Sequence, residues 1–256
     1  MIDIHCHILP GVDDGPKTVE ESLKLARLAE SEGITKIIAT PHHQHPSFEN
    51  SGFSVIREVE QLNHKLKEAN INIDVIPSQE VRLHGAMIRY LELGDVLPMT
   101  PGSSYILIEF PSNSIPHYTS RLFYDLKLQG YTPIIAHPER NKVLVEDPVM
   151  LFDFVKNGVL TQITAGSLTG HFGKKAMKFT EQLLESNLTH FLASDAHNCY
   201  ERPFLLTEAY AAVEELFGID MVYHLKENAE LLASQQHVQV LPPEPIRRKR
   251  RFFGLL

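Results

Sequence analysis

Several features are scarce or missing in this 256-residue chain, and each absence argues against a class of protein. No apolar run approaches the roughly 20 residues that a membrane-spanning helix needs. The first residues do not combine a basic segment with an apolar stretch, as a secretory signal would. Positive charge does not predominate, because the formal net charge is −8, which argues against a nucleic-acid-binding protein. With only two cysteines, we expect a protein of the reducing cytoplasm.

Two common ways of handling phosphate are also missing. A cysteine-dependent phosphatase needs an arginine six positions after its cysteine, but Val12 follows Cys6 at this distance and Leu205 follows Cys199. No glycine-rich loop with a following lysine is present to hold a nucleoside triphosphate. We therefore interpret Cys6 as a core residue and Cys199 as a loop thiol.

What the chain does contain is a regular alternation of short apolar runs and amphipathic stretches. Thr18 and Glu21 form a capping box ahead of the first helix, which Gly33 ends. Seven strand–helix alternations predict an α/β protein with a parallel sheet, whose natural closure in one chain is a barrel. The expected strands are 1–7, 36–40, 71–77, 105–110, 132–137, 159–165 and 189–194. The expected later helices are 53–69, 84–92, 117–129, 147–157, 172–187, 203–217 and 220–233.

Side chains that bind metals follow most of these apolar runs at the same relative position. His5 and His7 end the first run and project from one side of an extended strand, because the side-chain period there is two. Asp195 and His197 repeat this spacing after the last run. Barrel enzymes assemble their active sites at the C-terminal ends of the strands. The other candidates at strand ends are His42, Glu80, Glu109 and His137.

Each candidate taken alone has an ordinary structural explanation. His137 could be a hydrogen-bonded histidine, and Glu80 and Glu109 could be loop carboxylates. Asp13 and Asp14 precede a Gly-Pro pair and suit a turn, so only one of them need be a ligand. Scattered core histidines, however, would not share one position relative to their strands. The arrangement as a whole therefore predicts a metal site of mixed imidazole and carboxylate ligands.

Six short motifs contain the ligand candidates and their neighbours. They are DIHCHILPGVDDGP (3–16), TPHH (40–43), SQEV (78–81), IEF (108–110), AHPER (136–140) and SDAHN (194–198). Together they resemble the polymerase and histidinol phosphatase (PHP) superfamily. Within it they are similar to the Gram-positive capsule-operon tyrosine phosphatases, manganese-dependent enzymes that oppose bacterial tyrosine kinases. The resemblance covers about residues 1–235. It implies a distorted seven-stranded parallel (β/α) barrel with its metal site at the C-terminal ends of the strands.

The resemblance also implies three manganese ions, with iron or zinc as alternatives. The residues implied for the first ion are His5, His7, Glu80 and Asp195. Those for the second are Glu80, which bridges, with Glu109 and His137. Those for the third are Asp14, His42 and His197. No role is implied for His43 and His45, which we interpret as exposed loop histidines.

The expected chemistry is hydrolysis of a phosphate monoester. Clustered divalent ions lower the pKa of a bound water from about 16 toward about 7 and hold the attacking and leaving oxygens. Arg140 and Arg202 match family arginines that grip the phosphate, although either could instead form surface ion pairs. With His42 and Asp195 they are the expected catalytic residues.

Three functions are compatible with the sequence. The leading hypothesis is a metal-dependent protein-tyrosine phosphatase that acts, without a cysteine intermediate, on an autophosphorylated kinase of capsule or exopolysaccharide synthesis. The second is a phosphatase of histidinol phosphate or another small phosphomonoester. The third is a non-catalytic regulator that binds the kinase. The oligomeric state stays open.

Residues 236–256 are expected to form a flexible tail outside the barrel. Four residues at 242–245 include three prolines, and a basic run at 247–251 precedes the apolar residues 252–256. A solubilising end is one interpretation. The other is a weak contact of residues 246–256 with the inner face of a membrane, where basic side chains meet anionic lipid.

Overall fold

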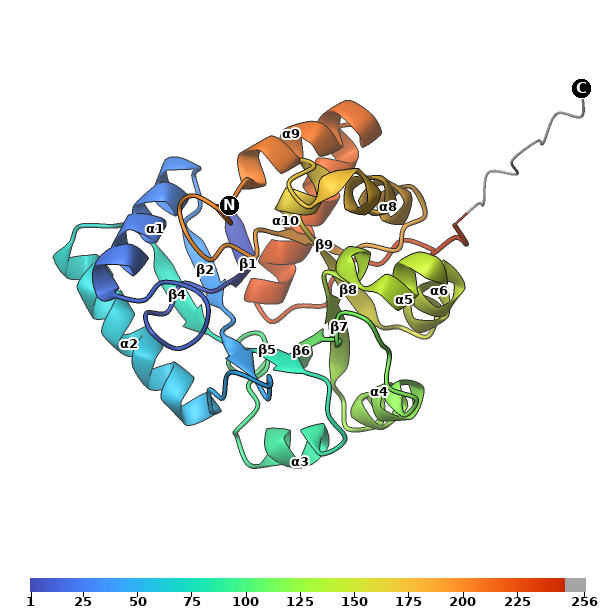
Figure 1. Ribbon diagram of the computed structural model, residues 1–256, viewed down its shortest axis with the longest axis horizontal. Helices are drawn as coiled ribbons and strands as arrows, with labels where there is room; N and C mark the ends of the chain where they lie inside the picture. Colours follow the sequence, from blue (N-terminus) through green and yellow to red (C-terminus); the bar gives the residue numbers. More distant parts are fainter. Residues whose placement is uncertain (247–256) are drawn as a thin grey trace, which may run out of the picture.

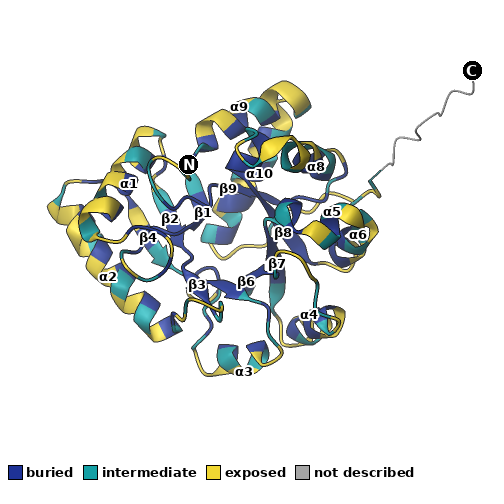
Figure 2. Cartoon of the chain, in the orientation of Figure 1, coloured by how far each residue is buried: buried dark blue, intermediate teal, exposed yellow. Residues whose placement is uncertain are grey.

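The computed structural model describes residues 1–246 and has an α/β fold with parallel strands. Strands lie at the centre and helices surround them (Figure 1). Figure 2 shows that the strands are buried, whereas the outer faces of the helices are exposed. The α/β class and the parallel pairing expected from the alternating pattern are therefore confirmed.

The strands form two sheets. The three-stranded sheet has the order β1 (Ile2–Cys6), β2 (Lys36–Ala39) and β4 (Asp74–Pro77). The six-stranded sheet has the order β3 (His42–His43), β5 (Glu80–Arg82), β6 (Tyr105–Glu109), β7 (Thr132–Ala136), β8 (Leu160–Thr164) and β9 (Phe191–Ala193). The longer helices are α1 (Val19–Ser31), α2 (Gly52–Glu68), α4 (Thr119–Leu128), α6 (Pro148–Lys156), α8 (Gly173–Glu185), α9 (Leu206–Phe217) and α10 (Ile219–Ala233).

A closed seven-stranded barrel is not confirmed, because the hydrogen-bonded strands form two separate sheets, one of three strands and one of six. Two of the expected strands are interrupted, and β2 and β4 each continue after a short break as β3 and β5. Pro41 lies in the first break and has no N–H to donate to a ladder. β1 and β9 form no ladder among the described residues; an isolated bridge joins Cys6 to Ala196, just after β9, and Ser194 is hydrogen-bonded to Asp3, while α10 contacts both strands.

Short elements that the apolar pattern did not predict follow the strands β7 and β8. They are the 3₁₀-helix η1 (Pro138–Arg140), α5 (Lys142–Glu146) and α7 (Ala165–Leu168). The remaining short helix, α3 (Met87–Glu92), lies inside the expected range 84–92. The first half of the predicted capping box is confirmed, because the Thr18 side chain accepts a hydrogen bond from the Glu21 N–H at 3.3 Å, whereas the Glu21 carboxylate accepts from the Lys17 N–H. The three short elements η1, α5 and α7 contain too few residues for a helical period to be visible in the sequence.

The described part of the expected tail, residues 236–246, is hydrogen-bonded to the body of the protein. The Val238 N–H donates to the Tyr105 hydroxyl, and Asn228 exchanges two hydrogen bonds with the Gln239 backbone. The predicted membrane contact falls almost entirely on residues 247–256, outside the described residues. Among residues 1–246, none of the helices combines the length and the apolar character needed to cross a membrane.

Candidate metal centre

The structure brings all nine predicted metal ligands together. Most lie at or just beyond the ends of strands, whereas His42 and Glu80 follow the breaks after β2 and β4 and are the first residues of β3 and β5. Each belongs to at least one group of side chains whose donor atoms lie within 4.8 Å of one another. The groups are His7, Asp14, His42 and His197; His5, His7 and Glu80; His5, His137 and Asp195; and His42, Glu80 and Glu109. These overlapping groups do not coincide with the three sets implied by the resemblance, so the division of ligands among ions stays a prediction.

The deepest group has the spacing of a coordination shell. The Nε2 atoms of His5 and His7 lie 3.3 Å apart. The Glu80 Oε2 atom lies 3.5 Å from the first and 3.3 Å from the second, and the Asp195 Oδ1 atom lies 3.5 and 3.4 Å from them. These distances match the edge of about 3.4 Å expected for a tetrahedron with metal–ligand bonds of about 2.1 Å.

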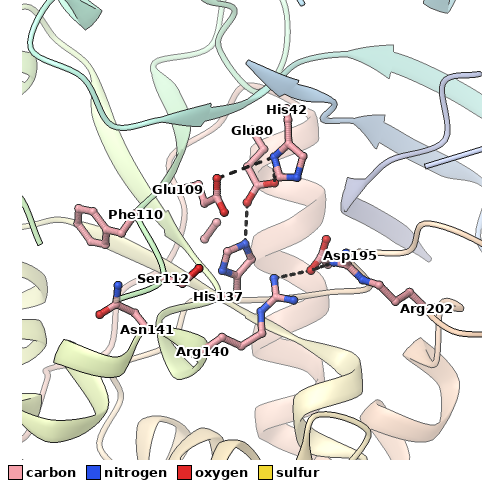
Figure 3. A pocket seen from close by; sticks show the side chains of 11 residues that line it. His42, Glu80, Glu109, Phe110, Ser112, His137, Arg140, Asn141, Asp195 and Arg202 are labelled. Atoms are coloured by element: carbon pink, nitrogen blue, oxygen red, sulfur yellow. Dashed lines mark hydrogen bonds and ion pairs between the residues drawn. The ribbon is translucent and has the colours of Figure 1, made fainter. Parts of the chain in front are cut away.

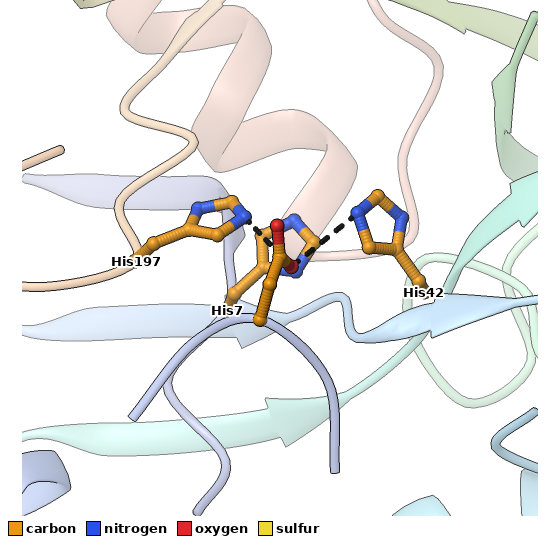
Figure 4. Close-up of side chains that lie close together, drawn as sticks. His7, His42 and His197 are labelled. Atoms are coloured by element: carbon orange, nitrogen blue, oxygen red, sulfur yellow. Dashed lines mark ion pairs between the residues drawn. The ribbon is translucent and has the colours of Figure 1, made fainter. Parts of the chain in front are cut away.

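A second group gathers at the mouth of the centre around Asp14, whose side chain is partly exposed. Its Oδ1 atom lies 3.2 Å from the His197 Nε2 atom and 3.6 Å from the His42 Nε2 atom. Figure 4 shows that the rings of His197, His7 and His42 lie close together. The other ring nitrogen of His42 lies 3.0 Å from the Glu80 Oε2 atom, so His42 faces both the mouth and the deeper carboxylates.

Several donor atoms of the cluster are buried without a hydrogen-bond partner among the described residues. They are Glu80 Oε2, Glu109 Oε2, Asp195 Oδ1, His42 Nδ1 and His197 Nε2. A buried polar atom without a partner costs free energy of about 1–3 kcal/mol, and more when it is charged. Five such atoms at one place indicate that a ligand normally pairs with them. Because oxygen and imidazole nitrogen are mixed and thiolate is absent, the donor set fits manganese, iron or zinc.

Hydrogen bonds on the far side of three histidine rings set the tautomer. The His7 Nδ1–H donates to the Asp13 carboxylate at 2.7 Å, and the His5 Nδ1–H donates to the Gln162 Oε1 atom at 2.8 Å. The His197 Nδ1–H donates to the backbone carbonyl of Asp195 at 2.9 Å. In each ring the Nε2 lone pair is therefore left facing the cluster, as metal-binding histidines require.

Burial and neighbouring charges keep two of the histidines neutral. Burial and the Arg140 charge lower the pKa of His137 to about 4. Burial and the His7 charge lower the pKa of His197 to about 4. At neutral pH both rings are therefore unprotonated, which is the form that binds a metal ion.

The carboxylates of the cluster differ in their ionisation. Although burial alone would raise it, Arg140 and Arg202 hold the pKa of Asp195 well below its usual range. Burial and the Glu80 charge raise the pKa of Glu109 to about 7. Two carboxylates that share a site without a cation repel each other in this way. A divalent ion between them would remove the repulsion.

The sequence did not assign roles to the side chains that orient the ligands. The residues alone left Asp13 and Asp14 as alternatives, and the resemblance implied Asp14 as the ligand. The structure places Asp14 in the cluster, whereas Asp13 is buried behind His7 and accepts its Nδ1 hydrogen bond. Gln162 was missed, although a glutamine inside the buried strand β8 was a signal. Arg82 was also missed, and its Nε atom lies 3.3 Å from the Glu109 Oε2 atom.

Gln162→Leu is expected to weaken manganese binding by about 10- to 100-fold, because the His5 Nδ1–H loses its acceptor. Calorimetric titration of metal-free protein with Mn²⁺ measures the change. Gln162→Glu, which keeps an acceptor oxygen, is the matched variant and is expected to bind more tightly than Gln162→Leu. Equal affinities for the leucine variant and the wild type would show that this hydrogen bond does not orient His5.

The interpretation of His43 as an exposed loop histidine is wrong. Its side chain is fully buried, and its Nε2 atom lies 3.5 Å from the Asp95 Oδ2 atom. The residue belongs to the short strand β3, where alternate side chains face opposite sides, so it points away from the ligand His42. His45 is half-buried, and its ring stacks on that of His42 with 4.8 Å between the centroids.

A cavity of about 200 Å³ opens beside the cluster, with both predicted arginines in its wall. The Nη2 atoms of Arg140 and Arg202 lie 2.5 and 2.7 Å from the Asp195 Oδ2 atom. In Figure 3 the two guanidinium groups converge on this carboxylate, while Phe110 and Ser112 lie on the opposite side. The cavity thus has metal-binding side chains on one wall and two fixed positive charges on another, an arrangement that suits a phosphate dianion.

This combination of a parallel α/β fold with a buried imidazole and carboxylate cluster at its strand ends defines a class, the metal-dependent hydrolases. A family model described as capsular polysaccharide synthesis, CpsB/CapC, matches residues 1–233, and the chain belongs to this family. The family indicated by the sequence motifs is therefore confirmed.

The relatives are named as tyrosine phosphatases. The tyrosine-protein phosphatase YwqE of Bacillus subtilis is 46% identical over 252 residues, 98% of this chain and 99% of its own. The putative tyrosine-protein phosphatase CapC of Staphylococcus aureus is 38% identical over 256 residues, covering 100% of both chains. Crystal structures of YwqE and of CpsB from Streptococcus pneumoniae are described as those of unique metal-dependent tyrosine phosphatases. One of their chains matches with a TM-score of 0.94 and 46% identity, over 97% of this chain and 100% of that one.

Proposed function

We propose that this chain is a metal-dependent protein-tyrosine phosphatase that dephosphorylates an autophosphorylated bacterial tyrosine kinase in capsule or exopolysaccharide synthesis. The observation that carries the proposal is the buried ligand cluster opening into a cavity walled by Arg140 and Arg202. The names of the relatives support the phosphotyrosine substrate. The family description supports the link to capsule synthesis.

The proposal includes three manganese ions, held by the nine ligands at the strand ends. When bound, such ions would supply a water of lowered pKa and positive charge opposite the phosphoryl oxygens. The protein's own part is to orient the ligands and to keep the Asp195 carboxylate ionised. The Nδ1 hydrogen bonds fix the ring orientation of His5 and His7, and the two arginines hold Asp195 in its ionised form.

Arg140 and Arg202 would bind and orient the phosphate. Both guanidinium groups are held in place by one oxygen of Asp195, which leaves their other N–H groups for the non-bridging oxygens of a substrate. Planar guanidinium groups match two phosphate oxygens at once, whereas an ammonium group provides a single point of charge. The aromatic side chain of Phe110, in the wall of the cavity, suits the phenyl ring of the leaving group.

Neither cysteine is placed as a nucleophile. Burial raises the pKa of Cys6 well above its usual value, and its thiol donates a weak hydrogen bond to the Ala196 carbonyl. Burial also raises the pKa of Cys199. Because the thiolate is the reactive form of cysteine, both residues are kept in the unreactive state.

The test compares kcat/KM on a phosphotyrosine peptide and on histidinol phosphate, with and without a chelator. We expect faster turnover of the peptide, loss of activity on chelation and its recovery with Mn²⁺. A preference for histidinol phosphate would identify a small-molecule phosphatase instead. Absence of turnover of either substrate by metal-loaded protein would favour a non-catalytic regulator.

Arg140→Lys and Arg202→Lys are each expected to lower kcat/KM on a phosphotyrosine peptide by roughly 10²- to 10³-fold, as for other fixed donors to a developing anion. Metal content per chain, measured by elemental analysis, is expected to stay unchanged. Arg121→Lys on α4 is the matched control, because this arginine is exposed and contacts Asp125 and the Tyr124 ring on its own helix. Full activity of both active-site variants would remove the arginines from phosphate binding.

A further inference from the structure

A second hollow, of about 350 Å³, adjoins the catalytic cavity and is lined by basic and apolar side chains. We call it the basic groove, and its lining includes Arg140, Lys142, Lys175, Val145 and Phe172. These residues come from η1, α5 and the start of α8, and η1 contacts both helices. In Figure 1, α5 and α8 lie next to each other on one side of the strands.

Arg140 forms the wall between the two hollows, because it lines both. Its Nη2 atom reaches Asp195 in the catalytic cavity. Its Cζ atom lies 4.9 Å from the centroid of the Phe172 ring in the basic groove. A peptide whose phosphotyrosine occupies the cavity would therefore carry a neighbouring residue past the same guanidinium group into the groove.

The charge of the basic groove differs from that of the whole molecule. The chain has a net charge of −8, yet the groove presents three cationic side chains. Lys142 and Lys175 are exposed, and within residues 1–246 neither ammonium group forms an ion pair. Glu139, which also lines the groove, is buried and its Oε1 atom accepts hydrogen bonds from the Thr164 N–H and the Ser167 hydroxyl. The exposed lining is therefore positively charged.

We propose that the basic groove binds an acidic side chain flanking the phosphotyrosine, so that Asp or Glu beside the phosphorylated residue increases turnover. This inference rests on the proposed phosphatase function and specifies its substrate class. The carboxylate would meet Lys142 and Lys175 at the rim, while Val145 and Phe172 would contact its methylene groups. Charges at the rim of an interface act mainly through the rate of encounter and the choice of partner.

The experiment measures kcat/KM for three matched phosphotyrosine peptides, with Glu residues before the tyrosine, Glu residues after it, or Gln residues on both sides. We expect at least one acidic peptide to be preferred over the Gln peptide by about 1.5- to fivefold, the range for an exposed charge pair. This preference is expected to fall as salt concentration rises, because exposed charges are screened. In Lys142→Gln/Lys175→Gln it is expected to disappear, with p-nitrophenyl phosphate turnover unchanged.

The control is Lys174→Gln/Lys178→Gln. It removes two exposed charges from α8, the helix that carries Lys175, but none from the groove lining. It is expected to keep the preference for the acidic peptide. An equal loss in both double variants would attribute the preference to the general field of α8 and overturn the groove as a binding site. Equal turnover of all three peptides by wild-type protein would also overturn it, while leaving the phosphatase function intact. No turnover of any phosphotyrosine peptide would instead refute the proposed function.

Discussion

Asp195→Ala is expected to reduce kcat on a phosphotyrosine peptide by at least about 10³-fold, because groups that act as a unit fail together. One oxygen of this carboxylate lies 3.5 and 3.4 Å from the ligand nitrogens of His5 and His7. The other accepts hydrogen bonds from both Arg140 and Arg202. The substitution therefore removes a predicted metal ligand and frees two phosphate-binding side chains at once.

Two further measurements separate these losses. Elemental analysis of Asp195→Ala is expected to show less metal per chain than the wild type, whereas Arg140→Lys is expected to keep its metal. Asp153→Ala on α6, which removes an exposed carboxylate that belongs neither to the ligand cluster nor to the cavity lining, is the matched control and is expected to keep full activity. Full metal content together with unchanged kcat in Asp195→Ala would show that the assigned centre is not the active site.

The sequence carried enough information for the ligand cluster because its signal is local. Two ligands two positions apart on a strand must face the same way, and parallel strands bring their C-terminal ends to one edge. His5 with His7 and Asp195 with His197 are such pairs, and the structure brings both into the cluster. The groups behind the ligands have no such local signal. Gln162, for example, reaches His5 from a strand 157 residues away in sequence.

Whether the strands close into one barrel could not be predicted from the sequence, for a different reason. The alternation of strands and helices fixes the number of units, but not whether each ladder is continuous. Breaks after Ala39 and after Pro77 divide two strands, and β1 meets the segment after β9 at the isolated bridge from Cys6 to Ala196 and through hydrogen bonds of Ser194 rather than in a ladder. Such interruptions depend on backbone hydrogen bonds between distant segments. The basic groove likewise depends on how η1, α5 and α8 come together in space.

Manganese is expected to raise the thermal stability of the metal-free protein by roughly 5–10 °C. The buried cluster holds donor atoms of Glu80, Glu109 and Asp195 that lack hydrogen-bond partners among the described residues, and these atoms destabilise the fold without a cation. A ligand that binds only the folded state at 100 times its dissociation constant contributes about 2.7 kcal/mol. For a chain of this size, about 1 kcal/mol shifts Tm by roughly 2–4 °C.

The specificity of this stabilisation tests the donor set itself. Scanning calorimetry of chelator-treated protein, with Mn²⁺ or Mg²⁺ added back, is expected to show the larger shift with Mn²⁺. Mg²⁺ has the same charge but prefers oxygen ligands in an octahedral arrangement and retains its water, whereas the cluster places imidazole nitrogens of His5 and His7 beside its carboxylates. Glu80→Gln, which alters a residue shared by two of the ligand groups, is expected to lose most of the Mn²⁺ shift. Equal shifts for the two ions, or a full shift in Glu80→Gln, would mean that the stabilising cation binds elsewhere than in this cluster.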